Sequence, residues 1–212
     1  MFNGRKLIIA TKHKKESVIA PILEKGLGVR CFTDETFDTD TLGTFTGEIE
    51  RKLDPIATAR QKCLLAMELS NCDLGVASEG SFGSHPTIFF ASADDEFLIF
   101  IDKKNNLEII ARELSMETNF NGSEIENEKD LLEFAEAVKF PSHGLILRRS
   151  KKDNNDIIKG ITKLQDLKKA FHLLHKKFNG VYAETDMRAM YNPSRMSVIE
   201  NTAKKLVAKV NS

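Results

Sequence analysis

The fold is decided by residues 6–33, whose sequence is KLIIATKHKKESVIAPILEKGLGVRCFT. The apolar run from Lys6 to Thr11 predicts a short buried strand, and the next residues predict a helix from Lys15 to Lys25 that two glycines end. Val29 to Thr33 then predict a second strand. A strand, a helix and a strand within about 30 residues form a βαβ unit, so we expect parallel strands joined by a right-handed crossover.

Helices and strands continue to alternate through the rest of the chain. Asp54 and Pro55 are typical of a helix start, because aspartate caps backbone N–H groups and proline suits the first helical position. Asn192 and Pro193 repeat this construction before the last helix. We also expect a loop over 37–47, strands over 74–77, 97–102, 107–112, 144–148 and 181–184, a hairpin turn at 103–106, and helices over 128–138 and 163–178. The sequence therefore predicts an α/β fold with a mixed, mainly parallel sheet and flanking helices. We expect a single domain over 1–212. This domain can be elongated and two-lobed, with a central cleft between the lobes.

The composition excludes several classes of protein. Apolar residues make up 41% of the chain and charged residues 29%, which are ordinary values for a globular protein. No apolar run approaches the roughly 20 residues that a membrane helix needs, so we expect no membrane contact. The three cysteines include no Cys-x-x-Cys pair, which argues against a disulfide framework or a metal knuckle. The apolar run from Leu7 to Ala10 is too short for a signal peptide, and we expect a cytoplasmic location.

Acidic and basic residues balance at 31 each, so no overall charge attracts nucleic acid. The distribution along the chain is uneven, because residues 112–136 are acidic and residues 187–212 are basic. A basic C-terminal helix can contact nucleic acid or a protein, or it can simply present a solvated face.

Three polar segments are expected where strands end: Thr11 to Glu16, Ser78 to Pro86, and Thr185 to Arg195. Ligands of open α/β sheets bind beyond the carboxyl ends of the strands. If these three strands lie on one edge of a common sheet, the three segments converge on a shared site.

The first segment suits a phosphate. It opens a helix, whose N-terminal N–H groups and dipole favour an anion, and Thr11, His13 and Lys14 can contact that anion. The alternative is that its lysines only solubilise a turn. Neither a P-loop nor a Gly-x-Gly-x-x-Gly motif is present.

The second segment combines Gly, Ser, Glu and His within nine residues. Glu79 can hold a divalent metal or act as a base, His85 can shuttle a proton, and Ser78, Gly80 and Ser81 can contact the ligand. A serine nucleophile is not supported, because Glu79 stands where a nucleophile elbow requires glycine. The alternative is a purely structural turn.

The third segment offers a carboxylate beside two guanidinium groups. Asp186 can hold a metal, while Arg188 and Arg195 can bind phosphate. The alternative is an ion pair between Asp186 and an arginine. His143 precedes a strand and is a further candidate to face the cleft.

Three motifs carry a resemblance to a small bacterial family of uncharacterised proteins. They are ASEGSFG (77–83), FPSHG (140–144) and ETDMRA (184–189) followed by Asn192 and Pro193. The resemblance spans nearly the whole chain and implies no activity. Members of this family often continue into a paired-cysteine, zinc-ribbon-like tail.

More distantly, the first 85 residues resemble the inosine/xanthosine triphosphate pyrophosphatase and Maf-like superfamily. Ala10 and Thr11 match the opening of that superfamily, Ala57 and Arg60 match its helix, and Glu79 falls near its acidic loop. This resemblance implies binding of a nucleotide and Mg²⁺-dependent hydrolysis of a nucleoside triphosphate. In such a reaction we expect Glu79 and Asp186 to hold the metal, and Lys14 and Arg195 to take phosphate charge.

We therefore expect a protein that binds a nucleotide or another phosphorylated metabolite. Whether it is an enzyme is left open, as is its oligomeric state. The alternative is a non-catalytic binding module whose basic last helix contacts nucleic acid or a protein.

Overall fold

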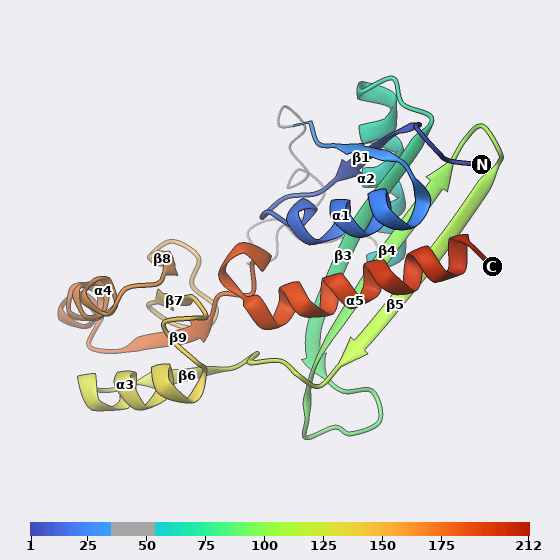
Figure 1. Ribbon diagram of the computed structural model, residues 1–212. Coiled ribbons are helices and arrows are strands. Elements are labelled where there is room, and N and C mark those ends of the chain that lie inside the picture. Colours follow the sequence, from blue (N-terminus) through green and yellow to red (C-terminus); the bar gives the residue numbers. More distant parts are fainter. Residues whose placement is uncertain (35–53) are drawn as a thin grey trace.

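The structure of the protein is a computed structural model that describes residues 1–34 and 54–212. The loop expected over 37–47 lies outside these residues. The chain forms two lobes, each built on its own sheet (Figure 1). Lobe 1 contains β1 (Lys6–Ala10), β2 (Arg30–Phe32), β3 (Leu74–Ser84), β4 (Ser92–Asp102), β5 (Leu107–Ser115), α1 (Glu16–Leu27), α2 (Pro55–Leu69) and α5 (Pro193–Val210). Lobe 2 contains β6 (Gly122–Ile125), β7 (Leu145–Arg148), β8 (Ile157–Ile161), β9 (Val181–Thr185), α3 (Glu128–Ala137) and α4 (Leu164–Phe178).

Lobe 1 has three layers. Its sheet has the strand order β2-β1-β3-β4-β5, in which β1 pairs in parallel with β2 and β3, and the remaining neighbours are antiparallel. The helices α1 and α5 pack on one face, where Leu7, Ile19, Phe100 and Ile199 are part of the core. The helix α2 covers the other face with an apolar stripe that includes Cys63. The predicted βαβ unit is therefore present as a parallel β1–β2 pair joined by α1.

The helix starts follow the sequence signals. The side chain of Asp54 accepts hydrogen bonds from the N–H groups of Ile56 and Ala57, and Pro55 begins α2. The side chain of Asn192 accepts from the N–H of Arg195, and Pro193 begins α5. Each cap satisfies N–H groups that the first helical turn leaves without a partner.

The segment from Ser78 to Ser84 is strand, and its prediction as a loop was wrong. β3 continues through it and pairs with β4 from Leu74↔Asp102 to Ser84↔Ser92. Gly80 and Gly83 are absent from the described residues with positive φ, so neither glycine makes a turn there. The long β3–β4 ribbon compensates for the low strand propensity of Gly and Ser with regular backbone pairing.

Lobe 2 is a four-stranded antiparallel sheet with the order β6-β9-β7-β8. Both of its helices pack on one face, where Leu131 and Phe171 lie in a core with inward residues of the strands, such as Leu145 and Ala183. The expected helices over 128–138 and 163–178 are confirmed. Two strands of this lobe, β6 and β8, were not predicted.

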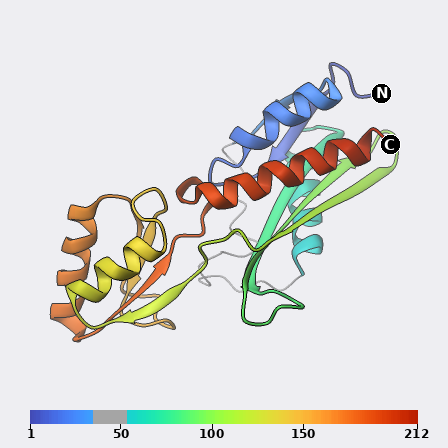
Figure 2. The same ribbon diagram turned by 60° about the horizontal axis from the view of Figure 1, so that its bottom comes forward.

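Two connections join the lobes and lie side by side (Figure 2). The first leads from β5 to β6, and the second leads from β9 to α5 through a short 3₁₀ helix, η2 (Ala189–Tyr191). The buried Asn192 donates to the Asn119 side chain across the connections, at 2.8 Å. Asn119 in turn donates to the carbonyl of Val138 in lobe 2, at 2.9 Å. The junction is therefore a hydrogen-bonded, buried contact.

The α/β class is confirmed, but the sheet is not mainly parallel. Among the described residues, two of the seven strand pairings are parallel. Ala10 and Ala77 lie side by side at the expected edge. The strand that ends near Glu184 belongs to the sheet of lobe 2, so the expectation of three strand ends on one common sheet was wrong. The three cysteines are free, and no helix in residues 1–34 and 54–212 is long and apolar enough to cross a membrane.

Candidate functional site

Seven polar side chains are buried together in lobe 1, near the carboxyl ends of β1 and the middle of β3. We name them the buried charge cluster: Lys15, Lys62, Ser78, Glu79, Asp94, Glu96 and Arg195. Each has at most 7% of its surface exposed, a rare environment for charged groups unless they are paired or bind a ligand.

Lys15 stands at the start of α1, directly after the β1–α1 turn, and is buried. Its ammonium donates to the Ser78 hydroxyl at 3.1 Å. The pKa of Lys15 is lowered to about 8, first by burial and then by the Arg195 charge, whereas Glu96 and Glu79 oppose the shift. At pH 7 Lys15 is therefore mostly in its charged, protonated form. Its hydrogen-bond partner in the described chain is the neutral hydroxyl of Ser78.

An ion pair joins α2 to β3. Lys62 of α2 donates to the carboxylate of Glu79, and both side chains are buried. Alternation along β3 turns Glu79 towards α2 and its neighbours Ser78 and Gly80 towards α1 and α5. The cluster therefore extends through the sheet.

A second ion pair joins α5 to β4. The Nε of Arg195 donates to Glu96 at 2.7 Å, and its Nη1 donates to the carbonyl oxygen of Met187. The guanidinium lies over the Phe82 ring, 5.0 Å from its centroid. Gly80 lies beneath this pair, and a β-carbon there would overlap both the Glu96 carboxylate and the guanidinium.

Asp94 is the least satisfied member. Its side chain is 1% exposed, and neither carboxylate oxygen accepts a hydrogen bond within the described structure. Burial raises the pKa of Asp94 to about 8, the Glu96 charge adds to the shift, and Arg195 and Lys15 oppose it. The carboxyl group of Asp94 is therefore mostly protonated at pH 7.

The described charges of the cluster then sum to a positive value. With Asp94 neutral, the cations Lys15, Lys62 and Arg195 stand against the carboxylates of Glu79 and Glu96. An excess positive charge in a buried site favours an anionic ligand.

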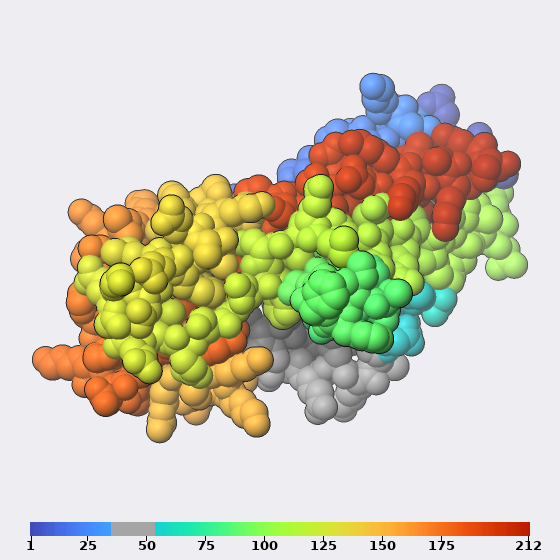
Figure 3. Space-filling view, turned by 90° about the horizontal axis from the view of Figure 1, so that it is seen from below, coloured from blue at the N-terminus to red at the C-terminus, as the bar shows by residue number. Residues whose placement is uncertain are grey.

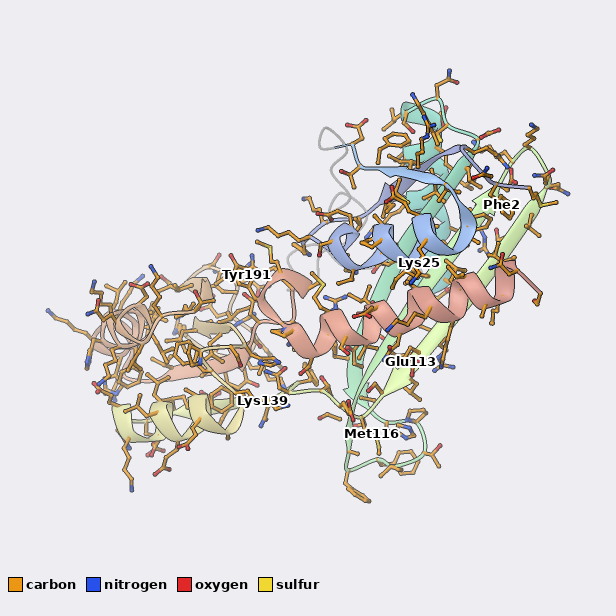
Figure 4. All side chains as sticks on the ribbon, viewed as in Figure 1. Phe2, Lys25, Glu113, Met116, Lys139 and Tyr191 are labelled. Atoms are coloured by element: carbon orange, nitrogen blue, oxygen red, sulfur yellow. The ribbon has the colours of Figure 1, made fainter. Side chains whose placement is uncertain are left out.

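A pocket of about 640 Å³ opens at the junction of the lobes. It is lined by the end of β5, by the first connection, by Lys139 of lobe 2 and by the first half of α5. Figure 4 labels Glu113, Met116 and Lys139 around this junction. Ser115 lines the pocket and pairs with Asp94 across β4 and β5, so the pocket adjoins the buried charge cluster.

Another pocket, of about 670 Å³, lies beside Arg5, Lys6 and Asp73. These residues are at the amino ends of β1 and β3. Ligands of parallel strands bind at the opposite, carboxyl ends, where the buried charge cluster lies.

Residues 62–212 match a protein family described as Domain of unknown function (DUF6671). The chain belongs to this family. No curated protein matches the chain. The match to the family runs from α2 to the end of α5 and includes Ser78, Glu96 and Arg195, while β1 and α1 with Lys15 precede it.

Membership of the family confirms the resemblance to uncharacterised conserved proteins, and the three motifs that carried it lie at two places. ASEGSFG forms the part of β3 that enters the cluster. FPSHG and the segment ETDMRA with Asn192 and Pro193 lie at the lobe junction. The resemblance to the pyrophosphatase and Maf-like superfamily stays a prediction.

The structure places the first predicted segment at the cluster, but with a different lysine. His13 and Lys14 adopt the left-handed region, with φ of 65° and 62°, which non-glycine residues seldom do. This turn leaves Lys14 exposed and directs Lys15 into the interior, while Thr11 is half-buried and donates to the carbonyl of Lys12. Lys15, rather than Lys14, enters the cluster.

The residues of the second predicted segment are spread along β3. Ser78, Glu79 and Gly80 contribute to the cluster, whereas Ser81 lies on the opposite sheet face from Gly80. His85 is at the far end of the ribbon, about 20 Å from Ser78 at the usual rise of a strand. Its Nδ1 accepts from the N–H groups of Thr87 and Ile88. This turn stands out from the surface in Figure 3 (green). His85 and Ser78 therefore do not share a site.

The third predicted segment divides between the lobes. Arg195 is in the cluster, but Asp186 accepts from Arg188 Nε at 3.0 Å and Nη2 at 2.6 Å, and from the N–H of Gly160 in β8 at 3.0 Å. Arg188 also lies over the Tyr191 ring, 4.6 Å from its centroid. This is the arrangement expected of an Asp–Arg pair that ties the end of β9 to its surroundings.

His143 lies at the lobe junction. It is buried, and its Nε2 lies 2.9 Å from the Ser194 hydroxyl and accepts from the N–H of Ser194 at the start of α5. Its Nδ1 lies 3.0 Å from the Ser142 hydroxyl. Burial lowers the pKa of His143, and the Lys139 charge adds to the lowering.

Four members of the buried charge cluster were not predicted from the sequence: Lys15, Lys62, Asp94 and Glu96. One signal for the two acids was available, because β4 alternates from Asp94 through Glu96 to Leu98 and Phe100, which belong to the core. A strand that buries Leu98 and Phe100 must turn both acids to the same face. Lys62 carried no comparable signal, because it is not one of the apolar residues that form the stripe of its helix.

Proposed function

We propose that two cations of the buried charge cluster, Lys15 and Arg195, bind the phosphate group of a nucleotide or a similar phosphorylated metabolite. The observation that carries the proposal is Lys15, a buried ammonium at the start of a helix whose hydrogen-bond partner is a hydroxyl.

The burial of Lys15 costs free energy that a hydroxyl offsets only in part. A buried charge without an opposite partner costs several kcal/mol, and proteins normally pair it or use it to hold a ligand. The N-terminus of α1 adds a dipole that favours negative charge. A phosphate at this position would meet a cation and the positive end of the helix dipole together.

Arg195 supplies a second cation close enough to influence the pKa of Lys15. Its position is fixed on three sides by Glu96, the Met187 carbonyl and the Phe82 ring. A guanidinium held in this way can present charge to a phosphate without losing much side-chain entropy on binding.

Glu79 and Asp186 do not fit the magnesium site that the sequence suggested. Glu79 is bound to the ammonium of Lys62, and Asp186 already accepts from Arg188 and a backbone N–H. Within the ranges 1–34 and 54–212, no group of three or more His, Cys, Asp or Glu side chains is arranged to hold a metal. Hydrolysis of a nucleoside triphosphate stays a prediction, and ligand binding is the part that the geometry supports.

The alternative of a nucleic-acid surface on α5 receives less support. Its three lysines each contact an intramolecular partner: Lys204 pairs with Glu200, Lys205 with Glu113, and Lys209 donates to the carbonyl of Ile110. A helix whose lysines bind within its own lobe has less charge to offer phosphates of a nucleic acid.

The test is calorimetric titration of nucleoside mono-, di- and triphosphates in EDTA, with the parent protein, Lys15→Met and Lys14→Met. Lys14→Met is the matched control, because it removes the neighbouring but exposed lysine. A charge-assisted hydrogen bond contributes about 1.5–3 kcal/mol, so Lys15→Met should weaken binding by about 10- to 100-fold.

The melting temperature of Lys15→Met without ligand should equal or exceed that of the parent, since the variant buries no charge. The proposal is wrong if no nucleotide or inorganic phosphate binds the parent, or if Lys15→Met binds as tightly as Lys14→Met.

A further inference from the structure

Two carboxyl groups of the cluster lie next to each other on β4. Asp94 and Glu96 are two residues apart on one strand, so their side chains point to the same face, with α-carbons about 7 Å apart. Both are buried, and the Glu96 charge contributes to the raised pKa of Asp94, which shows that the two groups interact.

Three of their four oxygens lack a hydrogen-bond donor in the described structure. One Glu96 oxygen accepts from Arg195, whereas its Oε2 and both oxygens of Asp94 accept nothing. A buried carboxylate normally accepts several hydrogen bonds, so three unused oxygens at one place are unusual.

These oxygens suit a hard divalent cation. Mg²⁺ and Mn²⁺ bind carboxylate oxygens, and Mg²⁺ is commonly held by one or two carboxylates, with waters and substrate phosphates completing its shell. Two acids are thus sufficient, although they do not form a site of three protein ligands.

The junction pocket lies one strand away from the two acids. Ser115 and Glu113 pair with Asp94 and Glu96, respectively, across β4 and β5, and both line the junction pocket. Directly paired residues have β-carbons about 5 Å apart, so the pocket comes within one residue of the unused oxygens.

We propose that a divalent cation of the Mg²⁺ type binds between the Asp94 carboxylate and Glu96 Oε2, and reaches them from the junction pocket. The completion of its shell by a phosphate oxygen rests on the proposed function. Binding of the cation alone does not, because the cation displaces the proton of Asp94 and then needs only the two carboxylates and water.

The experiment titrates Mn²⁺ alone at pH 8 and follows the loss of its free electron paramagnetic resonance signal. The parent protein is compared with Asp94→Asn and with Asp95→Asn. Asp95 is the matched control, because it lies on the opposite sheet face and pairs with Arg112 at 2.7 Å. We expect one bound Mn²⁺ in the parent and in Asp95→Asn, and at least a tenfold loss of affinity in Asp94→Asn.

Melting without metal confirms that Asp94→Asn is folded, which we expect because the amide has the shape of the acid it replaces. Mn²⁺ should then raise the melting temperature of the parent but not of this variant. Equal Mn²⁺ affinity in Asp94→Asn, or no binding to the parent at millimolar Mn²⁺, overturns the proposal.

Failure here is separable from failure of phosphate binding. Lys15→Met should keep its Mn²⁺ site, and Asp94→Asn should still bind nucleotide in EDTA.

Discussion

At residue 80 the lack of a β-carbon decides what can lie on the sheet face. Gly80 is opposite Glu96 in the β3–β4 pairing, and the Glu96–Arg195 pair occupies the space that a side chain would take. At Gly83, three residues later, a β-carbon would meet no described atom within 4 Å. Neither glycine makes a turn, and their roles differ by what lies above each of them.

Changing Gly80 to Ala should therefore displace the Glu96–Arg195 pair, while Gly83→Ala should not. Disturbing a buried ion pair costs about 3 kcal/mol, which corresponds to a fall of about 10 °C in melting temperature for a chain of this size. Thermal unfolding of both variants measures the difference. Equal melting temperatures would show that the pair moves aside at little cost.

For single residues, the sequence predicted the chemical type of a side chain at the site better than its exact position. Its prediction of a cation at the start of α1 fell on Lys14, and the structure buries Lys15. One residue of difference at a helix start rotates the side chain by about 100°. Since the turn before α1 has two residues with positive φ, propensity could not set this rotation in advance.

At the scale of the element, α5 links the cluster to the lobe junction. Asn192 caps the helix through its side-chain oxygen, and its side-chain nitrogen donates to Asn119 in the first connection. Three residues later, Arg195 projects into the cluster. The position of the helix start therefore sets the position of a proposed ligand-binding cation.

Asn192→Ala should be more destabilising than Asp54→Ala, although both remove a helix cap. The loss of a cap costs about 1 kcal/mol, and the buried Asn192 also loses a hydrogen bond that leaves the Asn119 side chain unsatisfied, which costs about 1–3 kcal/mol more. Urea unfolding of both variants measures these costs. If the two variants lose equal stability, the Asn192–Asn119 contact contributes nothing.

Element types were largely predictable from helix caps and apolar periodicity, whereas the length of β3 was not. The signals at Asp54, Pro55, Asn192 and Pro193 are local and gave correct helix starts. Residues 78–84 are strand because β4 pairs with them, and β4 begins only at Ser92. A partner that is distant in sequence outweighed the local turn signal of Gly and Ser.

At the scale of the whole molecule, His143 joins lobe 2 to the first turn of α5. Its Nε2 must be unprotonated to accept the N–H of Ser194. Protonation would remove this acceptor and place a positive charge at the positive end of the helix dipole. The lowered pKa of His143, caused first by burial, agrees with a neutral ring in the folded state.

Stability should therefore fall as the pH falls below about 6.5, the ordinary pKa of an unfolded histidine. In this range the unfolded chain takes up a proton at residue 143 that the folded chain takes up only at lower pH, so acid favours unfolding. The contribution is fully present above pH 6.5 and is lost at up to about 1.4 kcal/mol per pH unit as the pH falls towards the folded pKa.

Denaturant unfolding of the parent and of His143→Gln between pH 5 and 7.5 measures this effect. The chain has five histidines, so the difference between the two profiles, rather than either slope, reports residue 143. Parallel profiles would remove His143 as the source of the acid sensitivity.

The arrangement of the lobes could be predicted only in part. The βαβ pattern fixed the parallel edge of lobe 1 correctly. β9 belongs to the sheet of lobe 2 because it pairs with β6 and β7. These strands are distant from β9 in the sequence, so no local pattern predicts the pairing. The candidate site was also predicted only in part. A cation at the start of α1 was expected from the sequence, whereas the two acids of β4 were not.

The return of the chain to lobe 1 has a consequence for the order of folding. Ile199, Ala203 and Leu206 of α5 are part of the same core as Leu7, Ile9 and Ile19. Lobe 2, built entirely from residues between β5 and α5, has its own core and emerges from the ribosome before α5 emerges. Domains generally fold as units during synthesis, so lobe 2 is expected to fold before lobe 1, which closes around α5, the element of that lobe that is made after the others described here. The buried charge cluster, which needs Arg195, then forms only in the final step.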